Sequence, residues 1–172
     1  MRRIILFLLV FTSLQSLAQN EFAATAFYKD FNKIFADAQK GFVLNKSGKP
    51  LKDEFATMYK TKFLLSLADS GKIFFPNEGN PYVEYYFETE KRKENIDKRA
   101  ADLIEALSTA YNKPLYSETR TVTVKKDIFS NTFLYDQPEN VKDRKLLFRC
   151  SIYQVDKKYM LAFRIMGTAA AN

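Results

Sequence analysis

Residues 81–93, PYVEYYFETEKRK, place four side chains that could do chemistry at alternate positions. In an extended strand, alternate residues point to the same face. One face would therefore carry two phenol rings and two carboxylates, from Tyr82, Glu84, Tyr86 and Glu88. The other face would supply apolar side chains to a core, from Val83, Tyr85 and Phe87.

Three interpretations of this tyrosine–glutamate face are open. In antiparallel sheets, a strand commonly exposes a polar face of this composition to water. Tyrosine rings also suit a protein partner or a small ligand, because each ring offers flat apolar area and a hydrogen-bonding tip. The third interpretation is catalysis by paired carboxylates. Glu84 and Glu88 would lie roughly 13 Å apart along a strand, whereas a glycosidase pair is separated by about 5–9.5 Å.

The composition excludes several other chemistries. The chain has no histidine, so Ser-His-Asp catalysis, Cys-His catalysis and histidine-containing zinc sites are excluded. Its five glycines form neither a P-loop nor a dinucleotide-binding turn, and no calcium-loop pattern occurs. We therefore predict no catalytic residue, no metal site and no cofactor, which favours a protein that is not an enzyme.

The one cysteine, Cys150, lies in a stretch that alternates like a strand. The alternation groups it with apolar residues, namely Leu146, Phe148 and Ile152. Free cysteine is among the most buried residue types, so we expect a buried and inert thiol. A catalytic thiol or an intermolecular disulfide is the alternative, although a nucleophilic cysteine normally needs a histidine to activate it.

The first 18 residues have the pattern of a secretory signal peptide. Arg2 and Arg3 precede an apolar run over residues 4–11, and Ser16-Leu17-Ala18 fits the small-residue cleavage site. The run is far shorter than the ~20 residues needed to cross a bilayer. We expect cleavage after Ala18 and a periplasmic or secreted protein without stable membrane insertion.

Size and charge then describe the mature chain. Cleavage would leave 154 of the 172 residues and lower the formal net charge from +7 to +5, since two arginines are removed. One domain of this length can bury a core without disulfides. The charges of both signs are interleaved, which is typical of a solvated surface and argues against a nucleic-acid partner.

Two segments have the periodicity of amphipathic helices. Residues 21–40 place Phe27, Phe31 and Ile34 on one face, with Asn20 as the expected N-cap and Gly41 as the stop. Residues 91–111 repeat apolar side chains in a four-three rhythm and end before Pro114. We expect both helices to cover a sheet.

The remaining segments predict strands. Residues 62–69, 71–76 and 81–89 follow a loop over residues 44–53, and residues 53–60 fit either a helical turn or the entry of a strand. After the second helix, residues 118–126 alternate and residues 131–136 form a short strand. The strongest hairpin signal joins residues 145–155 to residues 158–166.

These elements predict an α+β fold in the order α-βββ-α-ββββ. Two amphipathic helices would pack on an antiparallel sheet of six to seven strands, and the order suggests two related halves. Residues 19–167 would form one domain, followed by a frayed tail over residues 168–172. The function that we predict is an exported, non-catalytic binding module of the cell envelope whose partner is an unknown protein or small ligand. The alternatives are a small hydrolase using Asp/Glu chemistry and a structural component of an envelope complex.

Overall fold

The protein folds as two helices packed on one antiparallel sheet of eight strands. The computed structural model describes residues 20–124, 127–137 and 141–169. In chain order the elements are α1 (Thr25–Ala38), β1 (Lys46–Lys52), β2 (Ala56–Thr61), β3 (Ser70–Pro76), β4 (Tyr82–Tyr86), α2 (Lys93–Tyr111), β5 (Leu115–Val124), β6 (Asp127–Asp136), the short 3₁₀ helix η1 (Val141–Asp143), β7 (Leu146–Val155) and β8 (Lys158–Met166). The predicted α+β class and antiparallel sheet are confirmed.

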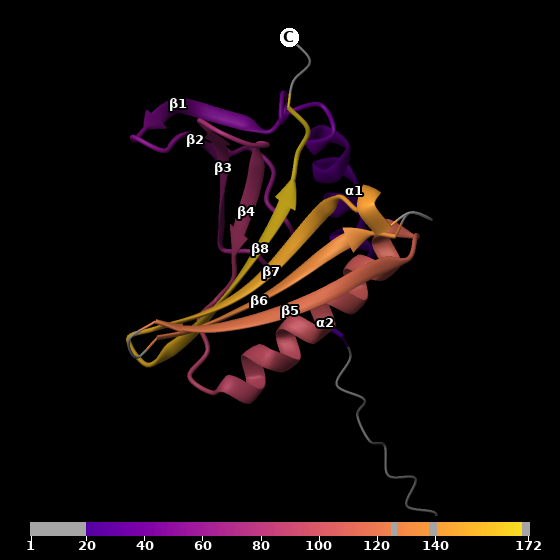
Figure 1. Ribbon diagram of the computed structural model, residues 1–172, viewed down its shortest axis with the longest axis vertical. Helices are drawn as coiled ribbons and strands as arrows, with labels where there is room; N and C mark the ends of the chain where they lie inside the picture. The colour runs from indigo at the N-terminus through magenta and orange to yellow at the C-terminus, as the bar shows by residue number, and fades with distance from the viewer. Residues whose placement is uncertain (1–19, 125–126, 138–140, 170–172) are drawn as a thin grey trace, which may run out of the picture.

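Each half of the chain is a helix followed by a four-stranded meander. The strand order β1-β2-β3-β4-β8-β7-β6-β5 joins the two meanders through their last strands, β4 and β8. The register of this seam places Glu84 opposite Arg164 at the middle of five residue pairs. The sheet twists strongly between its edge strands β1 and β5 (Figure 1).

The predicted count of six to seven strands was too low, because one strand lies in the expected loop. Residues 46–52 contain Gly48, Pro50 and three lysines, a composition that sequence patterns assign to loops. They form the edge strand β1, where proline and lysine are tolerated because one side of the strand needs no partner. The undecided residues 53–60 contain most of β2.

The predicted strand over residues 62–69 is wrong. This segment is irregular, and its apolar run KFLLSLAD buries Leu65 while Leu64 and Leu67 stay exposed. Asn45 organises it, since the side-chain oxygen accepts a hydrogen bond from the Phe63 N–H at 2.7 Å and the backbone oxygen accepts one from Lys62 at 2.7 Å. Side-chain hydrogen bonding to the backbone therefore replaces strand pairing here.

The helix ends differ from expectation at one point. Asn20 is not the N-cap of α1, which begins after Ala24. Its side chain instead accepts a hydrogen bond from the Phe22 N–H and donates one to the backbone oxygen of Asp102 in α2. Gly41 follows α1 with φ +72°, as the stop signal predicts.

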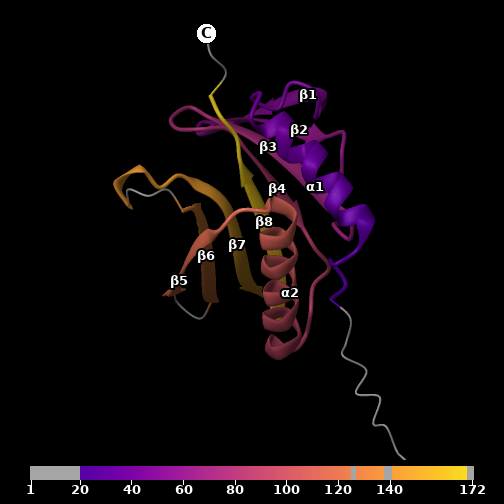
Figure 2. The ribbon, with the colours of Figure 1, turned by 90° about the vertical axis from the view of Figure 1, so that its right-hand side faces the viewer.

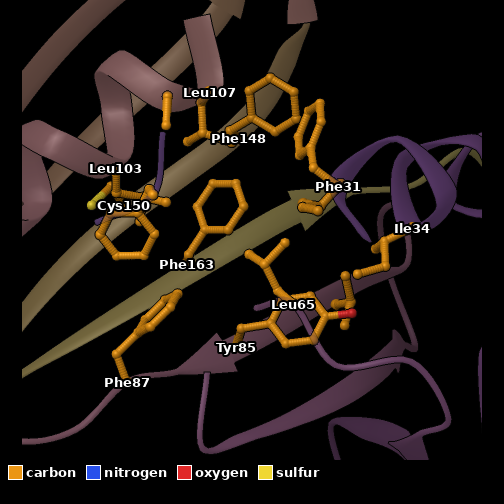
Figure 3. Packing of buried hydrophobic residues seen from close by; sticks show 14 of the residues in the cluster. Phe31, Ile34, Leu65, Tyr85, Phe87, Leu103, Leu107, Phe148, Cys150 and Phe163 are labelled. Atoms are coloured by element: carbon orange, nitrogen blue, oxygen red, sulfur yellow. The ribbon is translucent and has the colours of Figure 1, made fainter. Parts of the chain in front are cut away.

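Both helices lie on the same side of the sheet (Figure 2) and enclose the core. Phe148 of β7 lies beside Leu107 of α2 and Phe31 of α1, and Phe163 of β8 lies at the centre of the cluster (Figure 3). The strand face predicted to point inward is fully buried, since Val83 and Tyr85 are inaccessible and Phe87 nearly so. We call the opposite side of the sheet the helix-free face.

Two predictions concern the ends of the chain. The expected signal peptide, residues 1–18, lies outside the described residues. The expected tail begins at Thr168, whose N–H and hydroxyl donate to the backbone oxygens of Ala38 and Gln39. Within the ranges described, neither helix combines the length and apolar character that crossing a membrane requires.

Candidate functional site

A row of charged side chains crosses the helix-free face at the centre of the sheet. Directly opposite residues of neighbouring strands share a face, so the register aligns Lys60 of β2, Lys72 of β3, Glu84 of β4, Arg164 of β8 and Arg149 of β7. This row holds four cations and one carboxylate. It therefore has a surplus of positive charge.

Glu84 is the centre of this row and is 6% exposed, although no helix covers it. Arg164 donates two hydrogen bonds to its Oε2 atom, from Nε at 2.8 Å and from Nη2 at 2.5 Å. Nη2 of Arg149 lies 3.8 Å from the same oxygen. Two guanidinium groups thus share one carboxylate, and the buried Nε of Arg149 has no hydrogen-bond partner in the described part of the chain.

Aromatic rings fix the position of Arg164. Its guanidinium carbon lies 3.6 Å from the ring centroid of Tyr82, and the Tyr82 ring stacks on Phe74 with centroids 4.8 Å apart. Burial raises the pKa of the Tyr82 phenol, and the charge of Arg164 partly counteracts this shift. The phenol therefore keeps its proton at neutral pH and offers a hydrogen-bond donor.

Tyr86 lies on the other side of Glu84 and is half-buried. Burial is the largest cause of its raised pKa, and the charge of Glu84 and a hydrogen bond with it raise the pKa further. The cross-strand neighbours of Tyr86 have small side chains, first Ala162 and then Ser151. We call the whole surface the arginine–tyrosine face; it consists of Phe74, Tyr82, Glu84, Tyr86, Arg149 and Arg164.

Glu88 does not join the other three predicted site residues. The strand β4 ends at Tyr86, so the alternation that would align Glu88 with Glu84 stops before it. Glu88 is exposed and lines a polar pocket of about 360 Å³ beside α2. The structure thus brings Tyr82, Glu84 and Tyr86 together and places Glu88 elsewhere.

The polar pocket gathers four carboxylates, which is the arrangement that the hydrolase alternative requires. They belong to Glu21, Glu88, Glu90 and Asp102. Two of the four are paired with cations of α2: Arg99 donates to Glu21 at 2.5 Å and Lys98 to Asp102 at 2.6 Å. These pairs give Glu21 and Asp102 structural partners, which leaves Glu88 and Glu90 as the other two carboxylates of the pocket.

Cys150 lies in the core beneath α2, close to Leu103 (Figure 3). It is almost fully buried, and burial raises the pKa of its thiol to about 12. A protonated and inaccessible thiol is a poor nucleophile. Among the described residues, no group of three or more Cys, Asp or Glu side chains is arranged to hold a metal ion.

The sequence interpretation missed Arg149, Arg164 and Phe74. Both arginines interrupt strongly apolar strands at positions that alternate with core residues, as in Phe148-Arg149-Cys150. An arginine at such a position must point away from the core, and that alternation was the available signal. Their meeting at Glu84 depends on the pairing of β4 with β8, eighty residues away, which no local pattern specifies.

Comparison of this chain with protein-family models, with curated proteins and with solved structures finds no match.

Proposed function

We propose that the protein is an exported, non-catalytic binding module whose arginine–tyrosine face binds an acidic segment of a partner protein in the cell envelope. The observation that carries this proposal is the sharing of one buried carboxylate, Glu84, by Arg164 and Arg149. One carboxylate cannot neutralise two guanidinium groups, so the face retains positive charge that an acidic partner would complement.

The composition of the face supports a protein partner. Tyrosine and arginine are the residues enriched at the energetic centres of protein interfaces. Here the Phe74–Tyr82–Arg164 stack and the Glu84 hydrogen bonds hold these side chains in place before binding. A preorganised surface loses less side-chain entropy when a partner binds.

The export part of the proposal depends on the signal-peptide pattern of residues 1–18. An envelope location gives the face access to other exported proteins. The proposal does not use the carboxylate pocket beside α2, where ion pairs occupy Glu21 and Asp102.

The test uses three synthetic peptides of equal length, one rich in glutamate, one neutral and one rich in lysine. Each carries a fluorophore, and fluorescence anisotropy measures binding to the mature protein. We expect the acidic peptide to bind best, with an affinity that falls as salt is added. Equal binding of the acidic and neutral peptides would contradict the proposal.

Two arginine variants locate the site. Arg149→Gln removes a cation of the face while the bond between Arg164 and Glu84 stays in place. Arg120→Gln is the matched control, because Arg120 lies on β5 of the same sheet, exposed and paired with Glu118. We expect Arg149→Gln to weaken acidic-peptide binding by about tenfold and Arg120→Gln to change it little. Equal losses would place the site elsewhere.

The tyrosines are tested with a double variant, Tyr82→Ala with Tyr86→Ala. Its control is Phe55→Ala, which removes a 71% exposed ring from the β1–β2 turn. We expect the double variant to fold and to lose peptide binding, whereas the control keeps it. Circular dichroism and a thermal melt establish that each variant is folded before binding is compared.

A further inference from the structure

Besides the polar pocket near α2, the molecule has a hollow on the helix-free face, over the first three strands. It has a volume of about 310 Å³ and a mostly apolar lining. Its walls come from β1, β2 and β3, and its lining includes Lys49, Leu51, Met58, Lys60 and Lys72. We call it the lysine groove.

The backbone of β1 shapes this groove. Pairing with β2 shifts register between Ser47 and Leu51, and Gly48 within the shift has φ +73°. Such an irregularity bends an edge strand away from its neighbour. A Cβ atom added at Gly48 would meet no other atom within 4 Å. The positive φ, and not lack of space, is therefore what favours glycine at this position.

The charges of the groove are unbalanced. Lys60 and Lys72 are directly opposite each other on β2 and β3, an arrangement in which like charges destabilise a sheet. Lys49 adds a third ammonium group at the rim. Within the described ranges, none of the three lysines forms an ion pair; Glu84, the register partner of Lys72, is bonded to Arg164. An anion in the groove would offset this repulsion.

The floor of the groove is apolar. Leu51 and Met58 are cross-strand partners, and Leu51 is 63% exposed. Phe74 follows Met58 on the neighbouring strand and extends the apolar row. Covering an exposed leucine and its methionine neighbour with an apolar group is favourable, because it removes apolar surface from water.

We infer that the lysine groove binds a single-chain amphipathic anion, an aliphatic chain with a carboxylate head group, as in a fatty acid. The three ammonium groups would bind the carboxylate, and Leu51 and Met58 would contact the chain. The volume lies at the lower end of the range for ligand pockets, which suits one chain better than a two-chain lipid. Apart from Phe74, which adjoins Met58, this site uses other side chains than the proposed acidic-partner site, so either can fail without the other.

The probes are octanoate, decanoate and dodecanoate, with decanol and decyltrimethylammonium as the uncharged and cationic counterparts. Isothermal titration calorimetry on the mature protein, below the concentration at which each probe forms micelles, measures affinity. We expect the carboxylates to bind and the two counterparts to bind far more weakly. Affinity should rise about fourfold for each further methylene that the groove buries.

Variants place the probe in the groove. Lys60→Gln should weaken decanoate binding by about tenfold, and Leu51→Gln should reduce the gain per methylene. Lys52→Gln is the matched control, because Lys52 lies on the same strand and lines a hollow outside the groove. Lys60→Gln should not lower the free energy of unfolding, since it removes like-charge repulsion. Its binding to the acidic peptide should be retained.

Three results would overturn the inference. One is an affinity that does not depend on chain length. Another is an equal loss of decanoate binding in Lys60→Gln and Lys52→Gln. The third is binding to vesicles of anionic phospholipid without binding to monomeric decanoate, which would identify a membrane surface as the occupant.

Discussion

The first four strands of the sheet are five to seven residues long, whereas the last four are nine or ten residues long. Both halves nevertheless have the same order of elements, a helix and then a meander. In the second half, β5 and β6 pair along their full length without a register shift. In the first half, β1 is interrupted at Gly48, and the lysine groove lies beside that interruption.

The difference shows that a duplicated arrangement of elements need not duplicate its surface chemistry. On the helix-free face of the first half, Lys60 and Lys72 face each other, and neither forms an ion pair with another described residue. In the second half, Arg120 of the same face is paired with Glu118 on its own strand. The arginine–tyrosine face lies at the seam, where Glu84 of the first half meets Arg164 of the second.

The largest effect is expected from Phe148→Ala. Phe148 contacts the rings of Phe31 and Phe35 in α1, Tyr111 in α2 and Phe163 in β8, so it connects the two halves. Loss of this buried ring should lower the free energy of unfolding by about 3–5 kcal/mol. Urea unfolding followed by circular dichroism and by tyrosine fluorescence measures it.

The two probes also decide whether the halves are coupled. We expect coincident transitions in the wild type and in Phe148→Ala, because one core serves both halves. Val122→Ala, at an exposed position of β5, is the control and should have little effect. Separate transitions for the two probes would contradict unfolding as a single cooperative unit.

The next effect is expected at the seam, from Glu84→Gln. This exchange keeps the shape of the side chain but leaves Arg164 and Arg149 without their shared anion. Arg164 is partly exposed, so the cost should fall below that of a fully buried pair, at about 2–3 kcal/mol in chemical unfolding.

A double variant separates charge from packing at the seam. Glu84→Gln with Arg164→Met should be less destabilising than Glu84→Gln alone, because it leaves one uncompensated guanidinium fewer. Glu118→Gln, on the outer strand of the same face, should leave stability nearly unchanged. If the single and double variants were equally destabilised, the carboxylate would act through packing and not through its charge.

Local alternation predicted the inward faces of the central strands correctly. Val83, Tyr85 and Cys150 point to the core because these strands are paired on both sides and covered by helices on one. The same pattern left three interpretations of the opposite face open, and a wet strand face was one of them. Alternation alone did not indicate that Glu84 is buried, because its burial depends on Tyr82, Tyr86 and arginines from distant strands.

Both wrong element assignments have a common cause, because composition is a local property whereas strand pairing depends on tertiary partners. Residues 46–52 lack the apolar alternation of a strand, yet they pair with β2 as an edge. Residues 62–69 have apolar composition but find their hydrogen bonds with Asn45. Asn45 is fully buried, and its Nδ2 donates to the Tyr85 hydroxyl at 3.3 Å. No local signal distinguishes this asparagine from one in an ordinary loop.

A smaller effect is expected at alkaline pH, where each half holds a buried acid. Burial raises the pKa of the Tyr85 phenol in the first half and raises that of the Cys150 thiol in the second from 9.0 to about 12. The folded state therefore holds the thiol proton more tightly than the unfolded chain does. The stability from Cys150 is fully present below pH 9.0 and is lost as the pH rises toward about 12.

Cys150→Ala should flatten this dependence. The wild type should lose about 1.4 kcal/mol per pH unit from Cys150 within that window, and the variant should not. Urea unfolding at neutral pH and at about pH 10.5 under reducing conditions measures the two slopes. Tyr85→Phe removes the corresponding acid of the first half and serves as the comparison. If the free energy of unfolding fell equally steeply with pH in Cys150→Ala and in the wild type, the Cys150 thiol would not be the cause of the dependence.

The smallest effect is expected where the two helices end. After α1 the chain passes through Gly41 at φ +72°, whereas after α2 it passes through Asn112 at φ +54°. Glycine adopts this left-handed conformation at no steric cost, and asparagine does so at some cost. Asn112→Gly should therefore raise the free energy of unfolding by about 0.5 kcal/mol. Gly41→Asn, the reverse exchange in the first half, should lower it, and thermal melts of the two variants should shift in opposite directions. A destabilised Asn112→Gly would mean that the asparagine side chain stabilises this end of the helix by more than its backbone conformation costs.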